Sequence, residues 1–65
     1  MKIILNGAAT DVKHTNLAEA MRELGYVNRL YATAINGEFI RLTLRDTYTL
    51  KDGDTVEIVS PRQGG

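Results

Sequence analysis

The chain ends in Gly64-Gly65, directly after a strand-like run at 56–59 and a short linker at 60–63. Because glycine has no side chain, a terminal carboxylate carried on two glycines can be threaded into the narrow active site of another protein. The reactive group that this pattern offers is the carboxylate of Gly65. The alternative is a loose end or a remnant of cloning, since chain termini are commonly unstructured.

Other residue types that carry chemistry are scarce. The 65 residues include no cysteine, which excludes disulfides, thiolate metal sites and a cysteine nucleophile. His14 is the one histidine and makes a poor metal site alone, and Asp52-Gly53-Asp54 lacks the further ligands of a calcium loop. There is no Ser-His-Asp set and no phosphate loop. The sequence therefore predicts a protein that is not an enzyme and binds no metal or cofactor of its own.

The charge balance excludes further classes of partner. Eight basic and eight acidic residues cancel, so no excess positive charge is available for nucleic acid or for an anionic membrane. The apolar start at 1–5 is too short for a signal peptide or a membrane span, and Asn6-Gly7 interrupts it. These features predict a soluble, cytoplasmic protein.

Two Asn-Gly pairs organise the predicted strands, because Asn-Gly is the strongest short hairpin signal. Asn6-Gly7 joins strands expected at 2–5 and 8–13, and Asn36-Gly37 joins strands expected at 31–35 and 38–40. In the segment 41–47 the apolar residues follow neither a helical nor a strand period, so a loop with a short helical turn is expected. The remaining expected elements are a possible short strand at 48–50, a tight turn at 51–54 and a last strand at 55–59.

A single short helix is expected after Asn16, which is placed as an N-cap with Glu19 completing a capping box. Leu17, Met21 and Leu24 follow at the spacing of one helical stripe, and glycine at position 25 suits the end of the helix. A helix of this length is marginal alone, so it must be held by packing this stripe on the sheet.

The predicted order is β-β-α-β-β-β, an α+β fold in which a mixed sheet of four to five strands packs on one helix. The last strand is expected beside the first, burying Val56 and Ile58 next to Ile3 and Leu5. This is the β-grasp, or ubiquitin-like, arrangement. We expect one domain at 1–59 and a flexible tail at 60–65.

With this order, three segments resemble one known family. They are 1–7 (MKIILNG), 34–39 (AINGEF) and 52–65 (DGDTVEIVSPRQGG). Together they resemble the ThiS family, the small sulfur carrier proteins of thiamin biosynthesis, over essentially the whole chain. The chain departs from the family at 41–43, where many members carry a proline, and at Arg62, where a larger apolar residue is common.

The resemblance implies a specific chemistry at Gly65. A ThiF-like adenylating enzyme would transfer AMP from ATP, with Mg²⁺, to the Gly65 carboxylate. A persulfide sulfur, from a donor such as a cysteine desulfurase, would displace AMP and leave a thiocarboxylate. A ThiG-like thiazole synthase would then receive the sulfur. Gly64 and Gln63 would thread through the partner's active site, and the six residues from Ser60 reach roughly 20 Å when extended.

A docking surface is also expected from the strand pattern. Ile4 and Val59 each point away from the expected core face, so both should lie near each other on the open face of the sheet. An apolar pair there is a candidate partner patch, with Arg62 as a further docking candidate. The alternative is scattered surface hydrophobic residues, which are normal.

Three other functions stay open. The chain could carry sulfur for molybdopterin or another product, since such relatives share the fold and the Gly-Gly end. It could be a non-covalent β-grasp interaction module, which needs no terminal glycines. It could also be a modifier conjugated to lysines, which shares the adenylation step.

Overall fold

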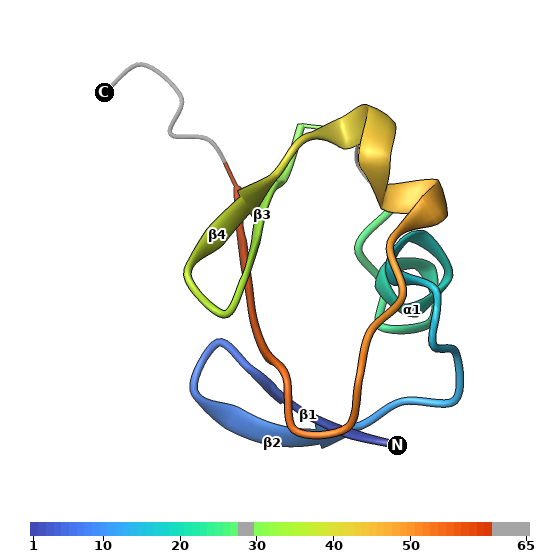
Figure 1. The fold of residues 1–65 in the computed structure, drawn as a ribbon, viewed down its shortest axis with the longest axis vertical. Helices are drawn as coiled ribbons and strands as arrows, with labels where there is room; N and C mark the ends of the chain where they lie inside the picture. The colour runs from blue at the N-terminus through green and yellow to red at the C-terminus, as the bar shows by residue number, and fades with distance from the viewer. Residues whose placement is uncertain (28–29, 61–65) are drawn as a thin grey trace.

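The computed structural model describes residues 1–27 and 30–60. Its elements, in chain order, are β1 (Lys2–Leu5), β2 (Ala8–Asp11), α1 (Leu17–Glu23), β3 (Ala32–Ile35), β4 (Glu38–Ile40), the 3₁₀ helix η1 (Leu42–Thr47) and β5 (Thr55–Val59). The strands form one five-stranded sheet in the order β2-β1-β5-β3-β4 (Figure 1). β1 and β5 are parallel, and the other neighbouring pairs are antiparallel. The predicted β-grasp fold and its element order are confirmed.

The last strand lies at the centre of the sheet, between β1 and β3. Its residues alternate strictly, with Val56 and Ile58 buried and Thr55, Glu57 and Val59 exposed. Ile3 of β1 is buried in the same core, as expected, whereas Leu5 is only partly buried against it. One face of the sheet therefore forms the core and the other is open.

Helix α1 covers the core face of the sheet. Leu17, Ala20 and Met21 are buried, and Leu24 is packed against them more loosely. Asn16 is the N-cap, because its Oδ1 accepts a hydrogen bond from the Glu19 backbone N–H at 3.0 Å. The second half of the expected capping box is wrong, since the Glu19 carboxylate instead accepts from Arg22 Nη2 at 2.6 Å.

Two predicted strands end or begin at different residues. β2 ends at Asp11 rather than at residue 13, because the Lys13 N–H donates to the Glu23 carboxylate instead of to a strand. β3 begins at Ala32 rather than at residue 31. Both Asn-Gly turns form as predicted, with positive φ at Asn6 (48°) and Asn36 (52°).

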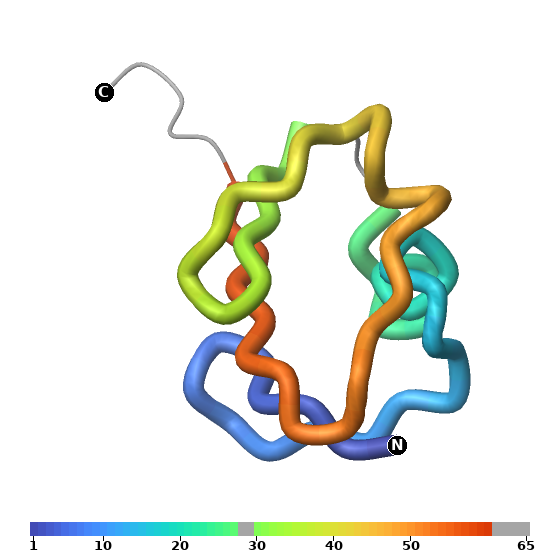
Figure 2. Tube along the Cα trace, viewed as in Figure 1, coloured from blue at the N-terminus to red at the C-terminus, as the bar shows by residue number. Residues whose placement is uncertain are grey.

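The segment between β4 and β5 lies on the helix side of the molecule. After β4 the chain forms η1, runs back beside α1 and turns into β5 (Figure 2). The possible strand at 48–50 is not a sheet strand, since Thr49 makes only an isolated bridge with Asn16. Leu50 is fully buried and Tyr48 partly buried, so this segment is held by packing on the core rather than by a ladder.

Candidate functional site

The chain leaves the sheet at Val59, the last residue of the central strand. Four of the predicted site residues, Arg62, Gln63, Gly64 and Gly65, lie outside the described residues. The described structure therefore shows the platform from which the tail starts. This platform consists of β5, the residues that hold it in register, and the open face around it.

Asn6 holds the end of β5 with its side chain. Asn6 Nδ2 donates to the Ile58 carbonyl oxygen at 3.1 Å, and the Ile58 N–H donates to Asn6 Oδ1 at 2.9 Å. The backbone pairing of β1 with β5 covers only Ile4–Thr55 and Leu5–Val56. The amide of Asn6 thus extends the parallel ladder by imitating a peptide group, one residue before β5 ends.

Asn36 holds the beginning of the same strand. Its Oδ1 accepts from the Thr55 N–H at 2.9 Å, and its backbone N–H donates to the Thr55 carbonyl at 2.7 Å. Asn36 Nδ2 also donates to Asp54 Oδ1 at 3.0 Å. Sequence reasoning assigned both asparagines only to turns. The signal that it missed is the side-chain amide, which offers a donor and an acceptor together.

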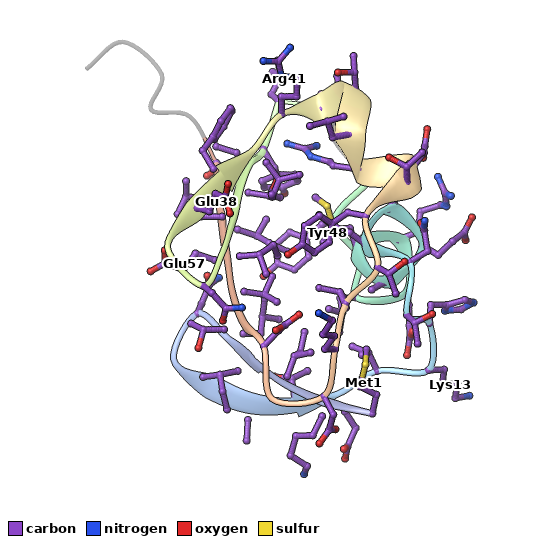
Figure 3. All side chains as sticks on the ribbon, viewed as in Figure 1. Met1, Lys13, Glu38, Arg41, Tyr48 and Glu57 are labelled. Atoms are coloured by element: carbon purple, nitrogen blue, oxygen red, sulfur yellow. The ribbon has the colours of Figure 1, made fainter. Side chains whose placement is uncertain are left out.

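The open face beside the tail's starting point carries an apolar surface. Val59 (58% exposed) is paired with Ala32, and Phe39 (67% exposed) is paired with Ala34 across the neighbouring strands. We call these four residues the open-face patch. Glu57, which is paired with Ala34, also points away from α1 (Figure 3). A carboxylate therefore lies beside the apolar surface on β5.

The structure places the two residues of the predicted docking pair apart on the open face. Ile4 is opposite Thr55, so it shares the open face with Val59 as expected. The two are nevertheless four residues apart along β5, which is about 13 Å at the rise of a strand. Ile4 and Val59 are therefore not neighbours. Phe39 is the large apolar side chain that sequence reasoning missed, although its alternation with the buried Ile40 signals an outward position.

The two aspartates of the turn before β5 accept hydrogen bonds from the backbone. Asp52 Oδ1 accepts from the Lys2 N–H at 2.8 Å, and Asp54 Oδ2 accepts from the Lys51 N–H at 2.8 Å. With Gly53 at φ +90°, these contacts confirm the predicted tight turn. Within residues 1–27 and 30–60, no group of three or more potential metal ligands comes together.

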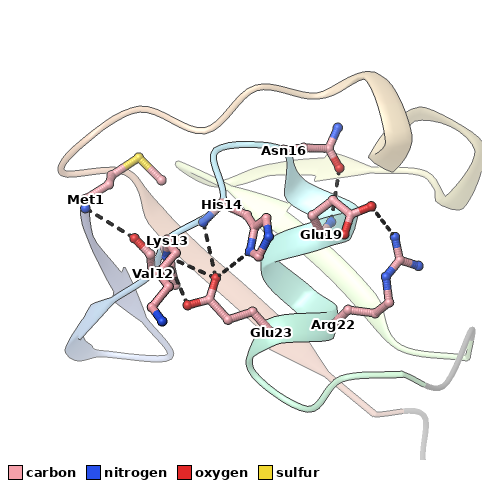
Figure 4. A network of polar contacts seen from close by, with 8 residues as sticks. All are labelled: Met1, Val12, Lys13, His14, Asn16, Glu19, Arg22 and Glu23. Atoms are coloured by element: carbon pink, nitrogen blue, oxygen red, sulfur yellow. Dashed lines mark hydrogen bonds and ion pairs between the residues drawn. The ribbon is translucent and has the colours of Figure 1, made fainter.

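His14 contacts a carboxylate rather than only solvent. Its Nδ1 lies 2.9 Å from Glu23 Oε1, and the Lys13 and His14 backbone N–H groups donate to the same carboxylate (Figure 4). The hydrogen bond with the His14 ring, followed by that from the Lys13 backbone, holds the pKa of Glu23 below its ordinary value. This cluster ties the segment after β2 to the end of α1, far from the tail.

Comparison with known proteins places the chain in a family. The model of the ThiS family matches residues 3–65. The chain belongs to the ThiS family. It is also similar to a crystal structure of the thiamine biosynthesis protein ThiS from Geobacter metallireducens. The TM-score is 0.85 at 29% identity, and the match covers 100% of both chains. Among curated proteins, no significant match was found.

The region matched by the ThiS family model contains every part of the platform. It includes both Asn-Gly turns, the whole of β5 and the glycines at 64 and 65. The resemblance predicted from three short segments is thus confirmed over nearly the whole length. In the part of the chain that the structure describes, no helix is long and apolar enough to cross a membrane.

Proposed function

We propose that this protein carries sulfur for the synthesis of the thiamin thiazole, with the carboxylate of Gly65 as the carrying group. The observation that carries the proposal is the ThiS family match, which extends through residue 65 and so includes the Gly-Gly end. The absence of cysteine from the sequence adds support, since the chain has no thiol on which sulfur could travel.

The proposed chemistry needs activation because a carboxylate oxygen is a poor leaving group. The Gly65 carboxylate attacks the α-phosphorus of ATP in a ThiF-like enzyme, forming an acyl-adenylate and releasing pyrophosphate. The enzyme's Mg²⁺ balances the phosphate charge. The terminal sulfur of a persulfide, supplied by a donor such as a cysteine desulfurase, then displaces AMP. A second thiol cleaves the resulting acyl disulfide and leaves the thiocarboxylate, which a ThiG-like synthase consumes.

This chain contributes position rather than catalytic groups. The open-face patch gives the adenylating enzyme an apolar surface beside the point where the tail starts. Residues 60–65 reach roughly 20 Å when extended, which is enough to enter a deep site while the folded body stays outside. Both thiols of the transfer must come from partners, because this chain has none.

The test is the intact mass of the protein after incubation with ATP, a sulfur source and the thiamin-pathway adenylating enzyme. We expect replacement of one oxygen by sulfur, localised to Gly65 by fragmentation. The control is the same enzyme acting on a carrier it is known to modify. If that control reacts and this protein does not, the thiamin assignment is wrong, and the molybdopterin-type enzyme becomes the next partner to assay.

A further inference from the structure

The two Asn-Gly turns each place a side-chain amide next to a backbone nitrogen that can attack it. The nitrogen of a glycine is the least shielded of all, because the residue has no side chain. The sequence contains two such pairs, at 6–7 and 36–37, whereas Asn16 and Asn28 precede leucine and arginine. Asparagine is among the thermolabile residues of proteins, and these two pairs are where the reaction is chemically easiest.

The reaction is deamidation, and it needs only water. The glycine nitrogen loses its proton and forms a bond to Cγ of the asparagine, the bond from Cγ to the amide nitrogen breaks, and ammonia leaves. The product is a cyclic succinimide. Water then opens the ring at one of its two carbonyl carbons, which gives aspartate or isoaspartate. One asparagine and one water thus become one acidic residue and one ammonia, with no change of oxidation state.

Packing does not block this reaction at either turn. Both asparagines and the glycines that follow them are exposed. A side-chain carbon added to Gly7 or Gly37 would meet no atom within 4 Å. The succinimide ring and the attacking water therefore have room at both turns, and protection must come from hydrogen bonds.

Hydrogen bonds hold both side-chain amides in the folded protein. Asn6 Nδ2 donates to the Ile58 carbonyl, and Asn6 Oδ1 accepts from the Ile58 N–H. Asn36 Nδ2 donates to Asp54 Oδ1, and Asn36 Oδ1 accepts from the Thr55 N–H. Because Nδ2 leaves as ammonia, each donor bond must be given up. The attack also makes the planar amide carbon tetrahedral, which disturbs the geometry of the acceptor bond.

The two sets of bonds lie at opposite ends of the central strand. Thr55 is the first residue of β5, and Ile58 is the last but one. Local opening of one end of a strand does not require the other end to open. The two amides are therefore released by different local motions of the same strand.

We propose that Asn6 and Asn36 are two deamidation sites, each gated by release of the end of β5 that its side chain holds. The reactive fraction at each turn is the fraction of molecules in which the local bonds are open. Two hydrogen bonds of ordinary strength keep this fraction at least about tenfold below that of an unstructured peptide. The proposal goes beyond the sulfur-carrier function and does not depend on it.

Deamidation would weaken the platform from which the tail starts. At Asn6 the product sets a carboxylate oxygen against the Ile58 carbonyl, and at Asn36 it sets a second carboxylate beside Asp54. Isoaspartate also lengthens the backbone of a turn whose length fixes the register of its hairpin. Each modification therefore loosens one end of β5.

The test is incubation of the full chain in mildly alkaline buffer, where the glycine nitrogen loses its proton more readily. Peptide mapping by mass spectrometry at intervals gives a deamidation rate for each asparagine. The references are synthetic peptides of residues 4–9 and 34–39. We expect both sites to react at least about tenfold more slowly in the protein than in the peptides. Asn16, which precedes leucine, is the internal control and should stay intact while the two sites react.

A variant at the end of β5 tests the gate at Asn6. Val59→Gly removes a β-branched residue directly after Ile58 and leaves the core intact, because Val59 is exposed. The end of the strand should then open more often, and Asn6 should deamidate about fivefold faster. The rate at Asn36 should stay unchanged.

A variant at the beginning of β5 tests the gate at Asn36. Asp54→Ala removes the acceptor of the Asn36 amide, so Asn36 should deamidate about fivefold faster and Asn6 at its former rate. Asp52→Ala is the matched control, since Asp52 lies in the same turn but accepts from the Lys2 N–H instead. This control should change neither rate.

Three outcomes would overturn the proposal. The protein and the peptides could deamidate at equal rates, each variant could speed both sites alike, as global unfolding would, or neither site could give product even in the two loosened variants. These readouts use neither ATP nor the adenylating enzyme. A negative result here therefore leaves the sulfur-carrier function standing, and the failure of that function leaves these two sites unaffected.

Discussion

Asn6 and Asn36 each contribute to the fold in two ways. Each adopts the left-handed backbone of an Asn-Gly turn, and each bonds the backbone of β5 with its side chain. Aspartate would tolerate the backbone equally well but would lack the amide donor. The residue type at these positions is therefore set by the central strand as much as by the turn.

Replacing Asn6 with glycine should destabilise the protein. Glycine keeps the turn, but both hydrogen bonds to Ile58 are lost, so we expect a decrease of about 1–2 kcal/mol in the free energy of unfolding, measured by urea denaturation. Asn6→Asp keeps the acceptor but sets a carboxylate oxygen against the Ile58 carbonyl, so it should also be less stable than the parent. An Asn6→Gly protein as stable as the parent would show that the side-chain contacts contribute nothing.

Gly65→Val should abolish adenylation and leave folding intact. A β-branched side chain adds bulk next to the reacting carboxylate, where the proposed threading needs a bare backbone. The measurement is pyrophosphate release with the adenylating enzyme, together with the thermal unfolding midpoint as the folding control. Full-rate adenylation of the valine variant would contradict the steric role of the terminal glycines.

At the scale of elements, Glu23 joins the segment after β2 to the last turn of α1. Its carboxylate accepts hydrogen bonds from the backbone of Lys13 and His14 and contacts the His14 ring. The same segment is also fixed by Val12, whose N–H donates to the Met1 carbonyl at 2.9 Å, and by Thr15, whose carbonyl accepts from the Leu50 N–H at 2.6 Å.

Glu23→Gln should lower stability near neutral pH and have less effect in acid. The pKa of Glu23 is lowered by folding, so its contribution is complete above the ordinary glutamate pKa of about 4.3 and disappears as the pH falls through the folded-state value. Urea denaturation across this range measures the difference between parent and variant. Glu57→Gln is the control, because Glu57 is exposed on β5. The stability difference between the parent and this variant should not become smaller as the pH falls.

Sequence reasoning predicted the elements where the local signals agreed with the final packing. The two Asn-Gly turns, the alternation in 55–59 and the Asn16 cap are local features, and all of them form. The segment 48–50 has strand-like residues, but its backbone bonds to residues 15–17 rather than to the sheet, which local composition cannot reveal. The burial of Arg45 could not be predicted either, because it depends on a hydrogen bond to the Tyr31 carbonyl, fourteen residues away in the sequence.

The candidate site could be predicted only in part for the same reason. The open face follows from alternation, which places Ile4 and Val59 on it correctly. Their separation depends on the register between β1 and β5, and no single strand encodes this register. Phe39 likewise comes near Val59 only because β3 lies between β4 and β5 in the sheet, an order that the hairpin signal alone does not determine.

At the scale of the whole molecule, the open-face patch should be needed for modification but not for folding. Phe39→Ser removes its most exposed large side chain, and we expect at least about a tenfold loss in kcat/KM for adenylation, with the unfolding free energy nearly unchanged. Leu44→Ser is the matched control, since Leu44 is also exposed (49%) but lies on η1. An equal effect of both variants would place docking elsewhere.

The central position of β5 also determines how the protein resists force. The hairpin of β1 and β2 and the hairpin of β3 and β4 are joined in the sheet only through β5. A partner that pulls on the chain beyond Val59 pulls along the axis of this strand, because the chain leaves it at its end. Such a load acts in shear on the ladders to β1 and β3. Their hydrogen bonds are then loaded together instead of breaking one after another. The strand from which the tail starts is thus anchored on both sides, by β1 and by β3.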